Sequence, residues 1–509
     1  MSGSISTGVL DPLTQFAFDN SQAGVNQTTN PVLIVGQVLA ANAQPFALYG
    51  CTSVPQARNF AGRGSHLARA FEAYFANDQI GPIYLLPYAD AGGATAATGT
   101  FVFTGPATAN GTVFAYIAGQ LVQVGVTSGN TATQIASALV AAITANPDLP
   151  VTATSATGTV TVTAKNKGTL GNFISLLLNY QALGQQQSLP AGVACAITAM
   201  SGGATDPDMT QIAALLGDTR MRLVVHGYAT NSTAMAAFAA LMNASTGRWS
   251  PLRGSLGHCF TAISGTTSAL QTYGPTNNDP HSSVFAYEAG SPTPPWEAAA
   301  IWAGSQASSF RTQPNAPTTG LPMNGFSPPP VGLAEASGGP FAKTTRNTLL
   351  GLGLGVAKYV VGAPLVDRAP TTYQVNSFGQ PDQSYFDTQD MFTLMAIQDF
   401  IQGWETQSFA QTLVADNGTK FGPGIKYTTP SLFLAGMVDL YMQMQFAGLV
   451  ESAAPFIAAS TVSRNLQYPN ELDVIWAPYL VVGLYQITNT IRFRKYSAAA
   501  AAAAQSAAA

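Results

Sequence analysis

Charged side chains are scarce in this sequence. They make up 9% of the residues, whereas about 25% is usual for soluble domains. The 20 Lys and Arg nearly balance the 24 Asp and Glu, which leaves a net charge of −4. Because nucleic-acid binding draws much of its free energy from Lys and Arg that neutralise phosphates, we expect no nucleic acid among the partners. A surface with so little charge repulsion favours self-association, so we expect a homo-oligomer.

Cysteines and long apolar runs are lacking as well. Cys51, Cys195 and Cys259 are too few and too scattered for a disulfide framework or a zinc cage. No apolar stretch reaches the roughly 20 residues that cross a bilayer, so we expect no direct membrane insertion. The first residues lack the basic and apolar regions of a signal peptide. A reduced, intracellular environment fits these absences best.

The common catalytic and nucleotide-binding motifs are missing too. No GxSxG elbow and no Walker A string occurs, and the glycines of 351–355 lack the spacing of a dinucleotide-binding turn. They lie in a helical pattern, where small residues allow close packing. His226 and His258 lie in predicted strands, which is typical of core histidines, and Asp279 with His281 lies in a Pro/Asn turn. We therefore expect no catalytic residue, no metal site, no cofactor and no enzyme activity.

What is present is a regular alternation of apolar strands and amphipathic helices in two stretches, 31–90 and 206–312. The predicted strands lie at 31–36, 83–86, 222–226, 258–263 and 283–287. The predicted helices lie at 66–76, 209–216, 234–242, 267–273 and 296–308. Short turns between these elements predict a doubly wound α/β body.

Residues 91–205 have a different texture. Their charges are confined to Asp148, Lys165 and Lys167. Short β-rich runs dominate, and one helix is expected at 131–145, with Ile135, Leu139 and Ile143 on one face. This pattern predicts a β-rich domain inserted into the α/β body.

The rest of the chain is predicted to contain a connecting loop, an α+β domain and two arms. The loop is the Pro-rich stretch 313–342, and the domain spans 343–486. Helices are expected at 345–361, 388–402 and 430–451, and two terminal strands at 477–484 and 486–493, the second of which enters the arm. Residues 1–30 form an N-terminal arm, and 487–509 form a C-terminal arm with an Ala-rich tail. The fold class is therefore α/β and α+β multidomain, with extended terminal arms.

The last predicted strand alternates apolar and polar side chains. Ile487, Ile491 and Phe493 share one face, and a basic cluster follows before Tyr496. A strand at the end of a chain can add to the sheet edge of another subunit, or it can close the sheet of its own domain. Periodicity alone leaves both possibilities open.

Two strings after the Pro-rich loop are specific enough to indicate a family. The first contains Arg368, Thr371, Thr372 and Tyr373, and the second contains Asp382, Tyr385 and Asp387. Shorter matching strings lie at 18–20, 32–37, 60–65, 168–172 and 473–493. On these residues the chain resembles the Mu-like contractile tail sheath proteins of bacteriophages over nearly its whole length.

That resemblance implies a structural subunit that polymerises as stacked hexameric rings around a tail tube. Contraction of the sheath would drive the tube through the host envelope, without a cofactor. The partners would be further copies of the chain, the tube protein, and the baseplate and tail terminator proteins. The location would be the phage tail, and the host cytoplasm during assembly.

The resemblance also assigns roles to parts of the chain. The 343–486 domain would face the tube, and the 91–205 insertion would decorate the outside. Both arms would pair with sheets of neighbouring subunits, through side chains that include Phe16, Phe18, Ile487, Ile491, Phe493 and Tyr496.

Alternatives remain open from the residues themselves. An α/β hydrolase-like enzyme with an inserted β-domain predicts a polar pocket that contains His226, His258 or Asp279. A non-contractile virion or surface-layer subunit would share the low charge. For the motif that starts at Arg368, a hydrogen-bonded corner is favoured over a subunit interface, because Thr-Thr-Tyr at a strand start commonly satisfies local backbone groups.

Overall fold

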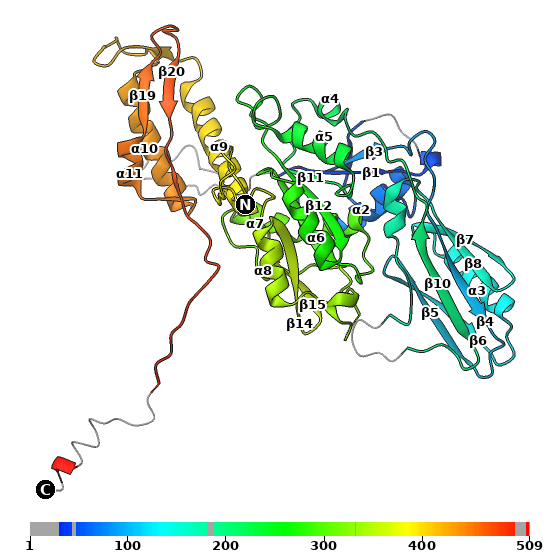
Figure 1. Ribbon diagram of the computed structural model, residues 1–509. Coiled ribbons are helices and arrows are strands. Elements are labelled where there is room, and N and C mark those ends of the chain that lie inside the picture. Colours follow the sequence, from blue (N-terminus) through cyan, green and yellow to red (C-terminus); the bar gives the residue numbers. More distant parts are fainter. Residues whose placement is uncertain (1–29, 43–46, 181–186, 331, 494–504, 508–509) are drawn as a thin grey trace, which may run out of the picture.

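The computed structural model describes residues 30–42, 47–180, 187–330, 332–493 and 505–507 (Figure 1). It shows a mixed α/β chain with several domains, as expected. A central α/β body carries the β-rich insertion on one side, at the right of Figure 1, and the C-terminal α+β part on the other. Residues 486–493 run away from the body as an extended segment.

The body is built on one eight-stranded sheet. Its strands are β1 (Val32–Gln37), β2 (Tyr49–Cys51), β3 (Ile83–Tyr88), β11 (Leu223–Val225), β12 (His258–Gly265), β13 (Ser282–Glu288), β14 (Leu354–Val360) and β15 (Ala363–Arg368). Their order is β15-β14-β13-β12-β11-β1-β3-β2. The six inner strands are parallel, and the edge strands β2 and β15 are antiparallel to their neighbours. Strand order therefore runs outward in both directions from the β1–β11 pair.

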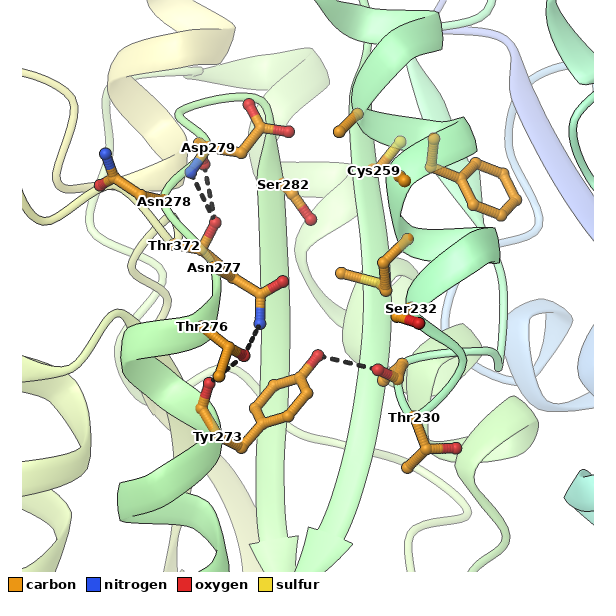
Figure 2. Close-up of a pocket in the computed structure, with 15 residues that line it drawn as sticks. Thr230, Ser232, Cys259, Tyr273, Thr276, Asn277, Asn278, Asp279, Ser282 and Thr372 are labelled. Carbon is orange, nitrogen blue, oxygen red and sulfur yellow. Dashed lines mark hydrogen bonds between the residues drawn. The ribbon is translucent and has the colours of Figure 1, made fainter. Parts of the chain in front are cut away.

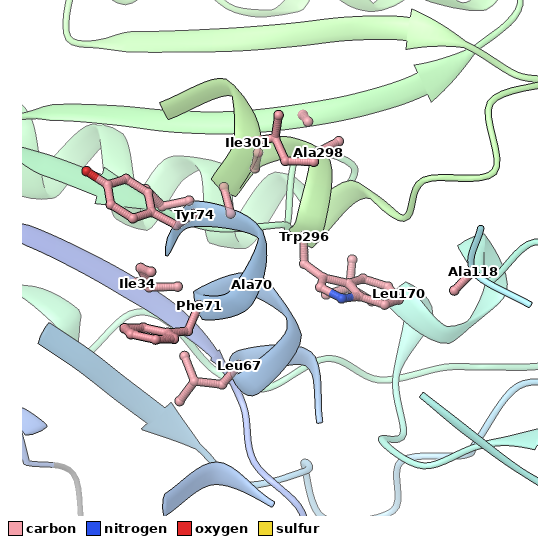
Figure 3. Close-up of a cluster of buried hydrophobic side chains, with 14 of the residues drawn as sticks. Ile34, Leu67, Ala70, Phe71, Tyr74, Ala118, Leu170, Trp296, Ala298 and Ile301 are labelled. Atoms are coloured by element: carbon pink, nitrogen blue, oxygen red, sulfur yellow. The ribbon is translucent and has the colours of Figure 1, made fainter. Parts of the chain in front are cut away.

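Helices cover both faces of this sheet. They are α1 (Val54–Ala61), α2 (His66–Phe75), α4 (Ile212–Leu216), α5 (Ser232–Met242), α6 (Thr267–Tyr273), α7 (Pro295–Thr312) and α8 (Lys343–Gly351). The connection from β1 to β3 and the connections from β11 to β13 run toward opposite edges of the sheet. Because such crossovers are right-handed, α2 lies on one face of the sheet and α5 and α6 lie on the other. The helix α7 packs against α2. Their apolar side chains form a continuous core with β1, which includes Ile34, Phe71 and Ile301 (Figure 3).

The insertion consists of two antiparallel sheets and one helix. Its elements are β4 (Thr98–Thr104), β5 (Gly111–Ile117), β6 (Gln120–Val126), α3 (Ala132–Ala145), β7 (Val151–Ala156), β8 (Thr159–Ala164), β9 (Leu176–Leu178) and β10 (Ala194–Ser201). The sheets have the orders β10-β4-β8-β7 and β6-β5-β9. Thr131 and Gln134 form a capping box at the start of α3, and Ile135, Leu139 and Ile143 are buried as expected.

The C-terminal part has its own small core. Its elements are α9 (Thr388–Phe409), β16 (Leu413–Val414), β17 (Tyr427–Thr428), α10 (Pro430–Phe446), β18 (Val450–Glu451), α11 (Ala453–Ala459), β19 (Thr461–Arg464), β20 (Leu472–Ile475) and β21 (Tyr479–Leu480). The core includes Met437, Tyr441 and Phe456. Short 3-10 turns elsewhere are η1 (Ala40–Asn42), η2 (Thr169–Phe173), η3 (Gly274–Thr276) and η4 (Glu335–Ser337).

The helix expected at 345–361 is wrong in its second half. The chain leaves α8 after Gly351, turns at Gly353 with φ +70°, and continues as β14. A positive φ is strained for residues other than glycine, so the string of three glycines favours a turn. Gly355 packs closely, as expected, because a Cβ there would lie 2.4 Å from the Trp302 ring.

Of the two strands expected at the end of the chain, the first is shorter than predicted and the second is wrong. Within 477–484 only β21 forms a ladder, with β18, and residues 486–493 belong to no strand. A strand needs a neighbouring strand to satisfy its backbone groups, and the described part of the chain offers this segment none. No described helix is long and apolar enough to cross a membrane.

Candidate functional site

The motif that starts at Arg368 folds into one corner between β15 and α9. Arg368 Nε donates to Asp387 Oδ1 at 2.8 Å and Nη2 donates to Oδ2 at 2.7 Å. This two-pronged geometry is the strongest arrangement available to an Arg–carboxylate pair. Asp387 is also the N-cap residue of α9, where a negative charge interacts favourably with the helix dipole.

The two threonines of the motif hold backbone groups that are distant in sequence. Thr371 donates its hydroxyl to the carbonyl of Tyr385 at 2.5 Å. Thr372 Oγ1 donates to the Asp279 carbonyl at 2.9 Å and accepts from the Asp279 N–H at 3.0 Å. Both threonine side chains are buried. Thr372 therefore ties the segment after β15 to the loop before β13, and Thr371 ties it to the segment before α9.

Tyr373, Asp382 and Tyr385 complete the corner. The Tyr373 hydroxyl donates to Asp382 Oδ2 at 2.8 Å, and the rings of Tyr373 and Tyr385 meet edge to face with 5.5 Å between centroids. Hydrogen bonds from the Ser384 side chain and backbone and from Tyr373 hold the pKa of Asp382 below its usual range. The structure thus brings all seven motif residues together.

Tyr485 joins the corner from the C-terminal segment, although sequence reasoning missed it. Its ring centroid lies 4.0 Å from the guanidinium carbon of Arg368, within cation–π range. Its hydroxyl donates to Gln389 Oε1 at 2.6 Å, and burial raises its pKa well above the usual value. The signal that the sequence offered for this contact was the position of a tyrosine just before the segment in which apolar and polar residues alternate. The corner therefore holds the chain immediately before the C-terminal arm.

Beyond Tyr485 the C-terminal segment contacts little. Ile487, Ile491 and Phe493 are 69%, 83% and 77% exposed. Single exposed apolar residues are common, whereas a run of them along a segment without a ladder is typical of an interaction site. The other arm residues expected from the resemblance, Phe16, Phe18 and Tyr496, lie outside the described residues.

The β19–β20 pair is a second exposed feature. In the described structure these strands pair only with each other, so both outer edges present unpaired backbone groups. Val462 and Val474 pack on the C-terminal core, while Ile475 is 59% exposed. This two-stranded ribbon, β19–β20, has the geometry of an acceptor for additional strands.

A groove lies between α5 and α6, close to the catalytic candidate Asp279 (Figure 2). It has a volume of about 520 Å³, and Met235, Cys259, Tyr273 and Asp279 are among the residues that line it. Asp279 is already engaged, because its Oδ1 accepts the His281 N–H at 2.9 Å. His226 and His258 do not line this groove.

Both of those histidines are buried in the core. Burial lowers the pKa of His226 to about 3 and that of His258 well below its usual value, so both are neutral near pH 7. The His226 ring stacks on Phe238 with 3.8 Å between centroids. Of the three residues that the enzyme alternative offers for a polar pocket, Asp279 lines the groove and the two histidines do not. No group of three His, Cys, Asp or Glu suited to a metal ion occurs in the described part of the chain.

Known proteins with similar sequences share one description. The model of the phage tail sheath protein central domain matches residues 202–363. The Mu-like prophage FluMu tail sheath protein of Haemophilus influenzae is 32% identical over 488 residues, which cover 95% of this chain and 97% of that protein.

Solved structures with a similar arrangement are more distant. The sheath tail protein of Desulfitobacterium hafniense is 10% identical, with a TM-score of 0.46 over 93% of this chain and 100% of that one. A sheath tail protein of Listeria innocua is 11% identical, with a TM-score of 0.47 over 89% and 92%. A chain of the anti-feeding prophage baseplate is 10% identical, with a TM-score of 0.47 over 97% and 99%. On the strength of the match to the Haemophilus protein over nearly the full length of both sequences, this chain belongs to the phage tail sheath family.

Proposed function

We propose that this tail sheath protein is the subunit of a contractile sheath, which polymerises as stacked hexameric rings around a tail tube. Contraction drives the tube through the host envelope. Its partners are further copies of the chain, the tube protein, and the baseplate and terminator proteins, and it assembles in the host cytoplasm. The observation that carries the proposal is an exposed, strand-patterned end, 487–493, on a chain that also contains the open-edged β19–β20 ribbon.

The C-terminal arm has the chemistry of a donated strand. Alternate side chains of a strand point to opposite faces, which places Ile487, Ile491 and Phe493 on one face and Thr488 and Thr490 on the other. Addition to a sheet edge would supply main-chain hydrogen bonds to the whole segment. The apolar face would be buried at the same time. Since a shift of one residue would expose that face, one pairing register is strongly preferred.

The geometry favours a ribbon in a neighbouring subunit as the acceptor. Tyr485 is held at the Arg368 corner. From there the described chain runs away from the β19–β20 ribbon of its own subunit (Figure 1). A donated arm therefore links two subunits and can stay paired while they rearrange.

The remaining parts of the chain take their places around this link. We assign 1–30 as a second donated arm, 31–90 with 206–312 as the body, 313–342 as the connecting loop, and 91–205 as the outer insertion. Because β14 and β15 belong to the body sheet, we place the part from α9 to residue 486, and not the whole of 343–486, against the tube. Its helix α10 presents an exposed apolar stripe of Leu432, Met442 and Phe446, which are 52%, 53% and 96% exposed.

Substitution of one arm residue tests the proposal. Ile491→Asp places a charge on the apolar face, and we expect it to abolish tube formation by the purified chain. Thr490→Asp is the matched control, because it adds the same charge one residue away on the opposite face, and we expect its tubes to form. Negative-stain electron microscopy and sedimentation measure both. Tubes from Ile491→Asp equal to those of the unmodified chain would refute the arm assignment.

A further inference from the structure

The carboxyl ends of β1 and β11 mark the point where strand order reverses. In doubly wound sheets, ligands bind in the crevice at this point, often against the first turn of the helix that follows the first strand. Here the helix that lies against the end of β1 is α2, the second helix after that strand, since a Cβ on Gly36 would be 3.1 Å from the Cα of Leu67. The scaffold of such a crevice is therefore present.

The insertion fills this crevice with a side chain. Asn166 follows β8 and is 1% exposed. Its Oδ1 accepts the N–H of His66 in the first turn of α2 at 3.0 Å. Its Nδ2 donates to the carbonyl of Val38 at 2.9 Å and to Asp90 Oδ1 at 3.2 Å. The amide thus bonds to α2 and to the segments that follow β1 and β3.

A second layer of bonds joins the same loop to the body. Gln37, the last residue of β1, is fully buried, and its Nε2 donates to Asp90 Oδ1 at 2.7 Å and to the carbonyl of Lys167 at 2.8 Å. The Lys167 N–H donates to Asp90 Oδ2 at 3.1 Å. From the segment that follows β11, the Tyr228 hydroxyl donates to Gln37 Oε1 at 3.3 Å. Residues from the β1 side and from the β11 side of the sheet therefore both contribute hydrogen bonds to this junction.

Contacts on either side extend the junction. Arg63 makes two hydrogen bonds of 2.7 Å to Asp148 of the insertion. Asp206 accepts from the backbone N–H and the hydroxyl of Thr169, both at 2.7 Å. One cluster of buried apolar side chains includes Leu170 of the insertion and Trp296 of α7 (Figure 3).

We infer that residues 165–168 are an internal plug, which occupies the crevice at the strand-order reversal and makes the insertion and the body a single folding unit. A buried polar group that loses its partner costs free energy, so opening the junction leaves Gln37 and the first turn of α2 unsatisfied. The insertion then moves with the body in any rearrangement of subunits, instead of swinging on its two connections. This inference does not depend on the proposed function.

The test compares two asparagines in the full-length chain. Asn166→Ala removes the three side-chain hydrogen bonds of the buried asparagine in the plug. Asn110→Ala removes an exposed bond within the insertion, in which Oδ1 accepts the Ser128 N–H at 2.8 Å. In calorimetry we expect one shared transition for the unmodified chain and Asn110→Ala. For Asn166→Ala we expect a lower midpoint, two transitions and protease cleavage near 91–93 and 202–205. An unchanged midpoint and cleavage pattern in Asn166→Ala would overturn the inference.

If Asn166→Ala does not fold, hydrogen exchange in the unmodified chain decides. The plug predicts that the amides of Lys167 and Thr169 exchange as slowly as those of β1, because all of them open together. Exchange at Lys167 and Thr169 about 100-fold faster than in β1 would show an insertion that opens independently, and would overturn the inference.

Discussion

A chain that ends at Gln486 is expected to form no tubes and to unfold at the same temperature as the full-length protein. The truncation removes the exposed residues Ile487, Ile491 and Phe493, which belong to no strand. It keeps Tyr485 and its contacts with Arg368 and Gln389. Assembly and folding therefore depend on different residues at this end of the chain.

Electron microscopy and circular dichroism measure the two outcomes of this truncation. A chain that ends at Tyr496 is the matched control, because it loses the Ala-rich tail and keeps the proposed arm, and we expect it to assemble. Tubes formed by the chain that ends at Gln486 would contradict the arm assignment. A lower unfolding temperature would instead show that the arm stabilises its own subunit.

Asp399→Ala is expected to destabilise the protein by about 3–5 kcal/mol, because it leaves a buried charge without its partner. Asp399 on α9 accepts hydrogen bonds from Arg220 and from Arg222 Nη2, the latter at 2.5 Å. Arg222, which immediately precedes β11, is 1% exposed, and burial lowers its pKa to about 10. This ion pair lies where the C-terminal part meets the body.

Thermal and denaturant unfolding measure this effect. Asp439→Ala removes an exposed aspartate from α10 and serves as the control, with an expected change of less than about 0.5 kcal/mol. The double variant Arg222→Met with Asp399→Leu should recover much of the loss, since apolar replacements of a buried ion pair are often tolerated. An Asp399→Ala protein as stable as the control variant would contradict the role of this pair.

Apolar patterns in the sequence predicted those helices and strands whose position depends on neighbouring residues alone. The strands β1 and β13 lie close to where their apolar runs placed them, because every residue of both strands is buried. The strand β14 was missed because the three glycines at 351, 353 and 355 and their apolar neighbours fit helix packing as well as a turn followed by a strand. The periodicity of 487–493 indicates a strand, yet a strand forms only where a second strand pairs with it.

The parts that could not be predicted depend on contacts between distant residues. Tyr485 meets Arg368 across more than a hundred residues, and Asn166 bonds to His66 across 100. A single asparagine in a loop carries no periodicity and no motif, so nothing near it in the sequence indicates a buried partner. The motif from Arg368 to Asp387 was visible as a string, but its bonds to Asp279 follow only from the fold.

Cryo-electron microscopy of the sheath assembled from the full-length chain tests the central claim most directly. The account predicts a helical tube in which residues 487–493 of one subunit form a strand on the free edge of β19 or β20 in its neighbour. A chain that stays monomeric at high concentration would contradict the account, and so would a tube in which 487–493 pairs within its own subunit.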